Sequence, residues 1–268
     1  MMVKGDAVVR RTLRMWLLRR VDGVLLYTSE VAKLYRSQFN YNGPVGLVPN
    51  LTDGRRFRES LSDSGPQAAK AIDRYGLNGK RVFLFVGRLS REKRIDRIIR
   101  AFAEAGLQNR DCVLAIVGDG GERGELENLI KELEIGQYVI FAGRRDGDAL
   151  AAWYRIASVF VLASEFEPFG AVVSEALSAG IPVVCSKMAG ARVLIEEGQN
   201  GSVVDAADAV ALRSQLLKWF DYCTPVSTDQ LSVLRPSLMA ASFQGVVDSY
   251  VQFLELVAEN AYNRRMTR

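Results

Sequence analysis

The 268-residue sequence contains no histidine, so a histidine general base and a histidine-ligated metal are both excluded within it. It has three cysteines, Cys112, Cys185 and Cys223, which are far apart and odd in number. Two of them lie in apolar strand candidates, so we interpret them as small core residues of a reducing compartment, not as metal ligands or disulfide partners. No apolar run approaches the roughly 20 residues of a membrane span. The first residues also lack the apolar core of a secretion signal, and we expect a cytoplasmic protein.

Most of the chain also lacks an excess of positive or negative side chains. The net charge is +4, but the first 20 residues hold six basic side chains against Asp6 alone, so the remainder is close to neutral. This distribution does not indicate a nucleic-acid-binding face. The basic segment Ala7–Val21 has helical spacing, with an apolar stripe at Val9, Leu13, Trp16 and Leu17. A core-facing helix is the first interpretation, and an interfacial helix at the inner face of a membrane is the alternative.

What the chain does have is an alternation of apolar runs with helical patterns, which predicts βαβ units and a parallel sheet. The fold class is therefore α/β: a Rossmann-like parallel sheet with helices on both faces, preceded by an incomplete strand–helix–strand segment. The expected strands are Gly23–Thr28, Val45–Val48, Val82–Val86, Val113–Val117, Tyr138–Phe141, Val159–Leu162, Val183–Cys185 and Ser202–Val204. The expected helices are Ser29–Tyr35 with Ser29 as N-cap, Arg94–Ala105, Glu122–Leu133, Ala149–Ile156, Ala171–Ala179, Ala209–Phe220 and Gln244–Glu259.

Four segments follow from this pattern. Residues 1–60 form the incomplete N-terminal segment. Residues 61–80, with Gly65-Pro66 and a short helix ending at Gly76, form a linker. Residues 81–235 form the main domain, and residues 236–268 a C-terminal helical segment.

The stretch Ser158–Ser186 is expected to form a strand, a loop, a helix and a strand. Its loop and helix start lie at the carboxyl edge of the sheet, where α/β proteins bind ligands. The N–H groups of Gly170, Ala171 and Val172 face outward there and suit a phosphate. Glu167 and Glu175 bracket this site. A carboxylate accepts two hydroxyl hydrogen bonds at once, so the pair suits the diols of a sugar or ribose.

The residues Glu167-Pro168-Phe169-Gly170 followed by Glu175-Ala176 resemble the paired-glutamate motif of family-four retaining glycosyltransferases. These enzymes have the two-domain GT-B fold and use nucleotide sugars. The resemblance implies that Glu167 reaches the donor sugar and Glu175 the ribose. It also implies that the loop from Phe169 to Val172 holds the sugar and the diphosphate.

Three further loops match the same family. Gly87-Arg88, with Lys93 five residues after Arg88, resembles its Gly-Arg and Glu-Lys pattern, which implies contacts with the donor diphosphate. A solvated charged loop is the alternative reading from the residues alone. The glycine turn at Gly118 is not a dinucleotide fingerprint, because Arg123 stands at the sixth position; in the family this turn lies close to the nucleotide. Arg144, with Arg145 beside it, stands where the family contacts the base.

The resemblance extends to the start of the chain and also has gaps. VDGVLLYTSEVAKLY and the later VPN resemble the end of the family's acceptor-binding domain. That domain is longer in the family, and its missing part carries a Gly-rich loop, a histidine and most of the acceptor site. Val193 stands where the family has a glutamate.

The resemblance implies a retaining transferase that moves a hexose from a nucleoside diphosphate sugar to a glycan or lipid-linked acceptor. Glu167, Arg88 and Lys93 would carry the chemistry with neither metal nor cofactor. One alternative is a donor-binding half that needs a complementing acceptor-binding chain, and another is an epimerase or phosphorylase on the same fold. Expected partners are the donor and acceptor, together with a membrane surface, a complementing chain or a second copy, and no nucleic acid.

Overall fold

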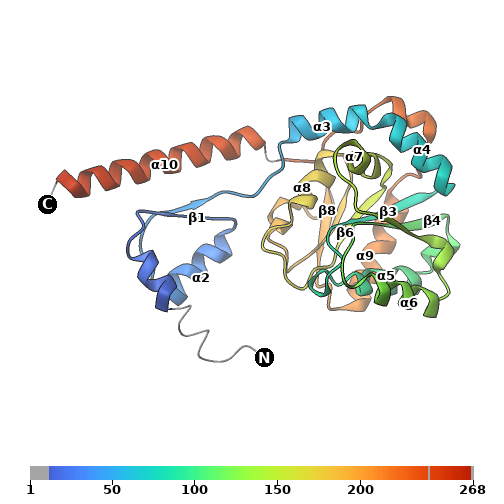
Figure 1. Cartoon of the computed structure of the whole chain (residues 1–268), viewed down its shortest axis with the longest axis horizontal. Coiled ribbons are helices and arrows are strands. Elements are labelled where there is room, and N and C mark those ends of the chain that lie inside the picture. Colours follow the sequence, from blue (N-terminus) through green and yellow to red (C-terminus); the bar gives the residue numbers. More distant parts are fainter. Residues whose placement is uncertain (1–11, 241, 267–268) are drawn as a thin grey trace. The chain divides into compact units, whose positions relative to one another are not determined.

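The computed structural model describes residues 12–240 and 242–266, which form two compact units (Figure 1). The larger unit is Leu51–Ala241, and the smaller combines Met1–Asn50 with Ser242–Arg268. These units differ from the segments expected at 1–60, 61–80, 81–235 and 236–268. Residues 51–80 belong to the larger unit, because the helices that they form pack on it. The C-terminal helix belongs with the first 50 residues.

The larger unit is built on a six-stranded parallel sheet in the order β5-β4-β3-β6-β7-β8. All but one residue of β3 and every residue of β4, β6 and β7 are buried, as continuous apolar runs in a parallel sheet require. The strand order runs outward from β3 to β5 and then returns to β6, so β3 and β6 are neighbours. The strands are β3 Arg81–Val86, β4 Cys112–Val117, β5 Val139–Gly143, β6 Val159–Leu162, β7 Val183–Ser186 and β8 Gly201–Val204.

The helices of this unit form two layers, one on each face of the sheet (Figure 1). Helices α3, α4, α7 and α8 contact one another on one face, whereas α5 contacts both α6 and α9 on the other. The helices are α3 Gly54–Asp63, α4 Gly65–Tyr75, α5 Ile95–Glu104, α6 Arg123–Glu132, α7 Gly147–Ile156, α8 Ala171–Ser178 and α9 Ala209–Tyr222. Short 3₁₀ turns are η1 Arg91–Lys93, η2 Leu107–Asn109, η3 Gly136–Tyr138, η4 Gly190–Leu194 and η5 Thr228–Ser232.

The expected linker at 61–80 is largely helical. The end of α3 and the whole of α4 occupy it, and both helices pack on α7. Their inner positions, Leu61, Ala68 and Ile72, are almost completely buried. A segment that buries apolar side chains in this way is part of the folded unit and not a flexible linker. Gly65-Pro66 therefore marks the start of α4 after the end of α3.

The smaller unit contains a two-stranded parallel sheet, β1 Val24–Leu26 with β2 Val45–Leu47, and the helices α2 Ser29–Phe39 and α10 Phe243–Met266. Helix α10 contacts β2. The N-cap of α2 is Thr28, whose hydroxyl oxygen accepts from the Val31 amide at 3.3 Å, and not Ser29 as expected. Residues 12–18 are helical, and the earlier part of the expected helix Ala7–Val21 lies outside the described residues. No helix in the described part of the chain is long and apolar enough to cross a membrane.

Candidate functional site

The loops that follow β3, β4 and β5 enclose an open cavity of about 520 Å³ at the carboxyl edge of the sheet. Backbone hydrogen bonds join these loops: the Leu89 amide donates to Asp119 O at 3.0 Å, and the Gly118 amide donates to Gly143 O at 3.0 Å. Four residues expected at a ligand site line this cavity, together with Val86, Val117, Asp119 and Arg145; the four are Gly87, Arg88, Gly118 and Arg144. The sheet edge therefore brings these four residues together, as the sequence predicts.

Gly118 is required for this arrangement. A Cβ atom built on Gly118 would lie 1.8 Å from the carbonyl oxygen of Gly87, and the residue has φ +145°, which side chains rarely adopt. The loops after β3 and β4 can approach this closely only because no side chain stands between them. The glycine thus fixes the floor of the cavity.

The cavity is electropositive. Arg88, Arg144 and Arg145 line it and are exposed, and Asp119 is the single acidic residue in the lining. Guanidinium groups bind phosphate oxygens through paired hydrogen bonds. The cavity therefore favours an anionic ligand with a phosphate group.

A second group of predicted residues lies between the loops after β3 and β6. Lys93, at the end of η1, forms an ion pair with Glu167, which lies just before α8. The two side chains are 20% and 11% exposed, so solvent screens the pair only partly. The Glu165 amide donates to Glu92 O at 2.8 Å, which joins the same two loops through the backbone. Lys93 and Glu167 thus place opposite charges side by side at the sheet edge.

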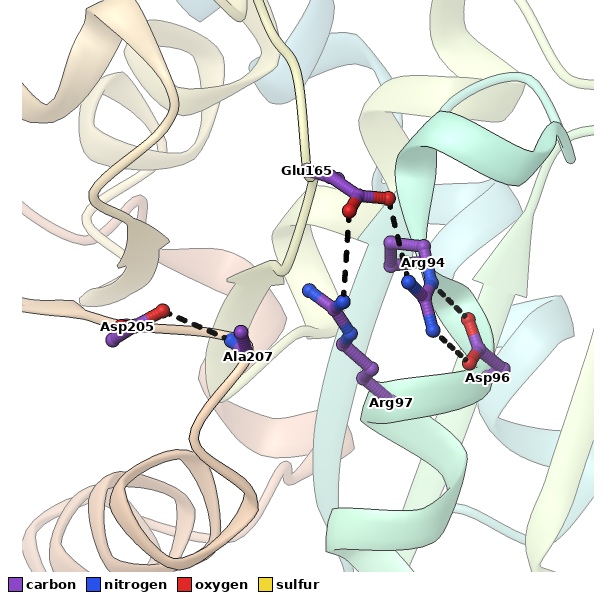
Figure 2. Close-up of polar contacts among 6 residues, drawn as sticks. All are labelled: Arg94, Asp96, Arg97, Glu165, Asp205 and Ala207. Atoms are coloured by element: carbon purple, nitrogen blue, oxygen red, sulfur yellow. Dashed lines mark hydrogen bonds and ion pairs between the residues drawn. The ribbon is translucent and has the colours of Figure 1, made fainter.

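Beside this pair is a contact that the sequence interpretation did not identify (Figure 2). Arg94 donates to both carboxylate oxygens of Asp96, at 3.0 and 2.9 Å, and to Glu165 at 3.3 Å, while Arg97 lies 3.9 Å from Glu165. The hydrogen bonds to Asp96 raise the pKa of Arg94 further above its usual value. Arg94 has a left-handed backbone with φ 49°, which is uncommon outside glycine. These ion pairs hold the turn that carries Lys93.

Figure 2 also shows a separate contact in the loop after β8, where the Asp205 carboxylate accepts from the Ala207 amide at 3.1 Å.

Helix α8 begins next to Glu167. Gly170 is its N-cap, with φ 95°, and Ala171 and Val172 form its partly exposed first turn. The first N–H groups of any helix lack partners within the helix and carry partial positive charge. The Phe169 ring is only 2% exposed, so that residue presents its backbone and not its side chain. The start of α8 therefore offers amide donors near the Lys93–Glu167 pair.

Glu175 lies one turn farther along α8, where it accepts hydrogen bonds from two neighbours. The Tyr154 hydroxyl donates to it at 2.7 Å and the Thr52 hydroxyl at 3.3 Å. Tyr154 is completely buried, and burial, followed by the charge of Glu175, raises its pKa well above the usual value. Tyr154 comes from α7, and nothing in the sequence pattern links it to Glu175. Part of the hydrogen-bonding capacity of Glu175 is thus used to hold a core tyrosine.

The expected site residues fall into two groups in the structure. Gly87, Arg88, Gly118 and Arg144 line the cavity; Lys93, Glu167 and the residues of α8 do not belong to its lining. Phe166, between Glu165 and Glu167 on the loop after β6, is 65% exposed, and no sequence motif marked it as a site residue. Within the described residues, no three His, Cys, Asp or Glu side chains gather in a way that could hold a metal ion.

Comparison with known proteins gives a consistent result. The family described as glycosyl transferases group 1 matches residues 69–222. An uncharacterized glycosyltransferase of Methanocaldococcus jannaschii is 40% identical over 122 residues, which are 46% of this chain and 31% of that protein. A GDP-mannose-dependent phosphatidylinositol monomannoside mannosyltransferase of Mycolicibacterium smegmatis is 30% identical over 203 residues, which are 73% of this chain and 53% of that protein. The match thus spans 31% to 53% of the length of these relatives.

Solved structures show the same fold. A sucrose-phosphate synthase of Thermosynechococcus elongatus superposes with a TM-score of 0.66 at 24% identity, over 100% of this chain and 64% of that one. Anabaena HepE in complex with UDP and glucose superposes with a TM-score of 0.70 at 22% identity, over 94% of this chain and 67% of that one.

Proposed function

Because this chain belongs to the glycosyl transferases group 1 family, we propose that its larger unit binds a nucleoside diphosphate sugar and presents the sugar for transfer. The observation that carries this proposal is the ion pair between Lys93 and Glu167 beside the start of α8. A cation and free helix amides at one sheet edge suit the diphosphate of such a ligand, and the carboxylate beside them suits its sugar hydroxyls.

The residues divide between two tasks in this proposal. Arg88, Lys93 and the amides of Gly170 to Val172 stabilise the negative charge that develops on the leaving diphosphate. Glu167 orients the sugar through its hydroxyl groups. The bond between the anomeric carbon and the diphosphate oxygen breaks, with its electron pair leaving on the diphosphate. The acceptor hydroxyl oxygen forms the new bond on the same face of the sugar and gives its proton to the leaving diphosphate oxygen, so the configuration is retained.

The names of relatives support a nucleotide-sugar donor. The mycobacterial relative is named as GDP-mannose-dependent, and the HepE structure contains UDP and glucose. We propose a hexose as the transferred group and a glycan or lipid-linked hydroxyl as its acceptor. We propose that the nucleobase binds near Arg144 and Arg145, and their position in the lining of the 520 Å³ cavity supports this.

A second candidate is a donor-binding half that transfers sugar only with a further acceptor-binding part. The observation that favours it is the two-stranded sheet of the smaller unit, β1 with β2. Two strands are marginal as an independent sheet, and Leu25 and Leu47 on them are 37% and 45% exposed. A longer polypeptide or a separate chain would supply the missing surface. One solved relative in fold is a complex named GtfA/B.

Calorimetric titration with UDP, GDP and ADP and with their sugar conjugates tests the proposal. We expect saturable binding of at least one of them, and Arg88→Ala should weaken it by roughly tenfold or more, because a charged hydrogen bond contributes about 1.5–3 kcal/mol. Folded protein that takes up none of these nucleotides at about millimolar concentration would refute the donor site. Transfer to an added acceptor by this chain alone would refute the second candidate.

A further inference from the structure

Two hydroxyl groups hold the carboxylate of Glu175, one on each oxygen. The Tyr154 hydroxyl donates to Oε2 at 2.7 Å, and the Thr52 hydroxyl donates to Oε1 at 3.3 Å. Within the residues that the structure describes, Glu175 forms no ion pair with a Lys or Arg side chain. Neutral donors therefore orient its negative charge, and no cation neutralises it.

The Glu175 carboxylate keeps acceptor capacity for a ligand. An ionised carboxylate offers about four acceptor positions, and Tyr154 and Thr52 occupy two of them. Tyr154 is completely buried, whereas Glu175 and Thr52 are only partly buried. The side of the carboxylate that faces Thr52 is thus the side nearer to solvent, where a hydroxyl group of a ligand can bind.

Thr52 is fixed in place by contacts that do not involve its own hydroxyl group. Its amide donates to the Ser174 hydroxyl oxygen at 3.1 Å, and the Ser174 hydroxyl donates to Ala171 O at 2.7 Å. The next residue, Asp53, is the N-cap of α3, and its carboxylate accepts from two amides of the first turn of that helix. Removal of the Thr52 hydroxyl alone should therefore leave the backbone of this segment in position.

The helix that begins after Thr52 packs on the other donor to Glu175. Phe57 of α3 contacts the Tyr154 ring edge to face, with the ring centroids 5.4 Å apart. Helix α3 also contacts both α7, which carries Tyr154, and α8, which carries Glu175. The two donors thus belong to one packed cluster, and the orientation of the carboxylate is set before a ligand binds.

We propose that Thr52 is a positioning residue of the donor site, which holds the Glu175 carboxylate ready to accept from the ribose hydroxyl groups of a bound nucleotide. This inference rests on the proposed function, and it takes Glu175 as the ribose ligand that the family resemblance implies. Because Glu167 is assigned to the sugar, the ribose is the other part of the donor with adjacent hydroxyl groups for a carboxylate. Thr52 lies outside residues 69–222, which match the family, so the ligand site extends beyond that range.

The role of Thr52 follows from the entropy of the carboxylate. A side chain that is already held in its bound orientation loses less freedom when the ligand arrives. If valine replaces Thr52, Glu175 keeps the Tyr154 hydroxyl as its donor and Oε1 loses its partner. The affinity contributed by the ribose hydroxyls should then fall, while the contacts of the diphosphate remain.

Calorimetric titration of the full chain tests this inference, with UDP, GDP or ADP and with the dideoxy form of the nucleotide that binds, whose ribose lacks both hydroxyl groups. The wild-type protein should bind the ribose form about tenfold more tightly than the dideoxy form, since hydrogen bonds to a charged group are lost. Thr52→Val should weaken binding of the ribose form about three- to tenfold and leave the dideoxy form unchanged. Thr52→Ser, which keeps the hydroxyl, should restore most of the affinity.

Three control variants separate positioning from other effects. Arg88→Ala removes a cation of the diphosphate site and should weaken both forms alike. Arg100→Ala removes an exposed arginine of α5, and Thr228→Val changes an exposed threonine of η5; neither should alter the binding of either form. If Thr52→Val does not fold, Thr52→Ala gives the same comparison.

The possible outcomes distinguish this inference from the proposed function. If the wild-type protein binds a nucleotide but does not distinguish the two forms, the inference is wrong and the proposed function stands. The same holds if Thr52→Val weakens both forms equally or weakens neither. Folded wild-type protein that binds none of the nucleotides would overturn both.

Discussion

Lys93 and Glu167 form an ion pair although 74 residues separate them in the chain. The pair forms because β3 and β6 are neighbours in the sheet and the loops that follow them end at the same edge. Lys93 is therefore already bound to a carboxylate before any diphosphate arrives. A ligand phosphate must share or displace Glu167, which couples the sugar and phosphate parts of the site.

This competition predicts opposite effects at the two positions. Lys93→Met should weaken the binding of a nucleoside diphosphate about tenfold, through the loss of one charged hydrogen bond. Glu167→Gln leaves Lys93 wholly available to phosphate, so affinity for the free nucleotide should stay the same or rise. The additional affinity contributed by the sugar of the conjugate should fall. Calorimetry on both variants, with Arg100→Ala as control, checks this. Equal weakening of nucleotide binding by both changes would show that Glu167 supports the loop and does not compete for Lys93.

Glu175 should contribute to stability as well as to binding. Glu175→Ala removes the acceptor of the buried Tyr154 hydroxyl, and we expect the free energy of unfolding to fall by about 1–3 kcal/mol. In Tyr154→Phe the donor itself is gone, so a further change at Glu175 should cost much less. Urea unfolding of the two single variants and the double variant measures this coupling. Strict additivity in this cycle would mean that the hydrogen bond contributes nothing.

Substitutions of Gly118 and Gly124 by alanine test whether the loops after β3 and β4 approach as closely as the structure shows, with Gly124 as the control. Gly118→Ala places a methyl group against the Gly87 carbonyl and should reduce stability by about 2 kcal/mol or more. Gly124 lies in α6, and its added Cβ would meet no atom within 4 Å. Gly124→Ala should therefore raise helix stability by about 0.5–1 kcal/mol. Thermal unfolding ranks the two, and a Gly118→Ala protein as stable as wild type would contradict the close approach of the two loops.

The buried thiols predict a loss of stability in alkali. Burial raises the pKa of Cys185 from 9.0 to about 12 and that of Cys223 from 9.0 to about 11, and it raises that of Cys112 as well. Their stabilising effect is complete below the unfolded-state pKa of 9.0 and is lost as the pH rises toward the folded values. In that window the unfolded chain releases protons that the folded chain retains, so each thiol lowers the free energy of unfolding by about 1.4 kcal/mol per pH unit.

Urea unfolding from about pH 8 to about pH 11 measures this slope. Cys185→Ala lowers stability near pH 8 because it leaves a small cavity, but its slope with pH should be shallower by about one proton, so its deficit should shrink as the pH rises. Slopes that are identical in wild type and Cys185→Ala would indicate that Cys185 does not contribute to the alkaline loss.

The positions of the strands and of the loops after them could largely be predicted from the sequence. Each buried strand is a continuous apolar run, and each loop begins where such a run ends. Lys93, Glu167 and Gly170 could be named as candidate site residues because the motifs around them resemble those of a known family. The contacts of Glu175 with Tyr154 and of Arg94 with Glu165 could not be predicted, because the partners lie on separate elements with no shared pattern.

Small errors in the expected boundaries also have physical causes. Thr28 and Ser29 both carry a hydroxyl that can cap a helix, and only the backbone conformation decides that Thr28 does so. The stretch 61–80 contains Gly65-Pro66, which suits a linker and the first turn of a helix equally well. Its burial against α7 depends on residues distant in the chain, which local patterns do not include.

The return of the chain from β5 to β6 has a consequence for how the protein folds. The strands β3, β4 and β5 pair with sequence neighbours, as do β6, β7 and β8, so each half of the sheet is a local block. Within the sheet, the blocks are joined where Phe83 pairs with Val159 and Leu84 with Phe160, across more than seventy residues. Pairing over such a separation carries a large loop-closure entropy and is slow. We therefore expect the junction between the halves, and with it the meeting of Lys93 and Glu167, to form late in the folding of the larger unit.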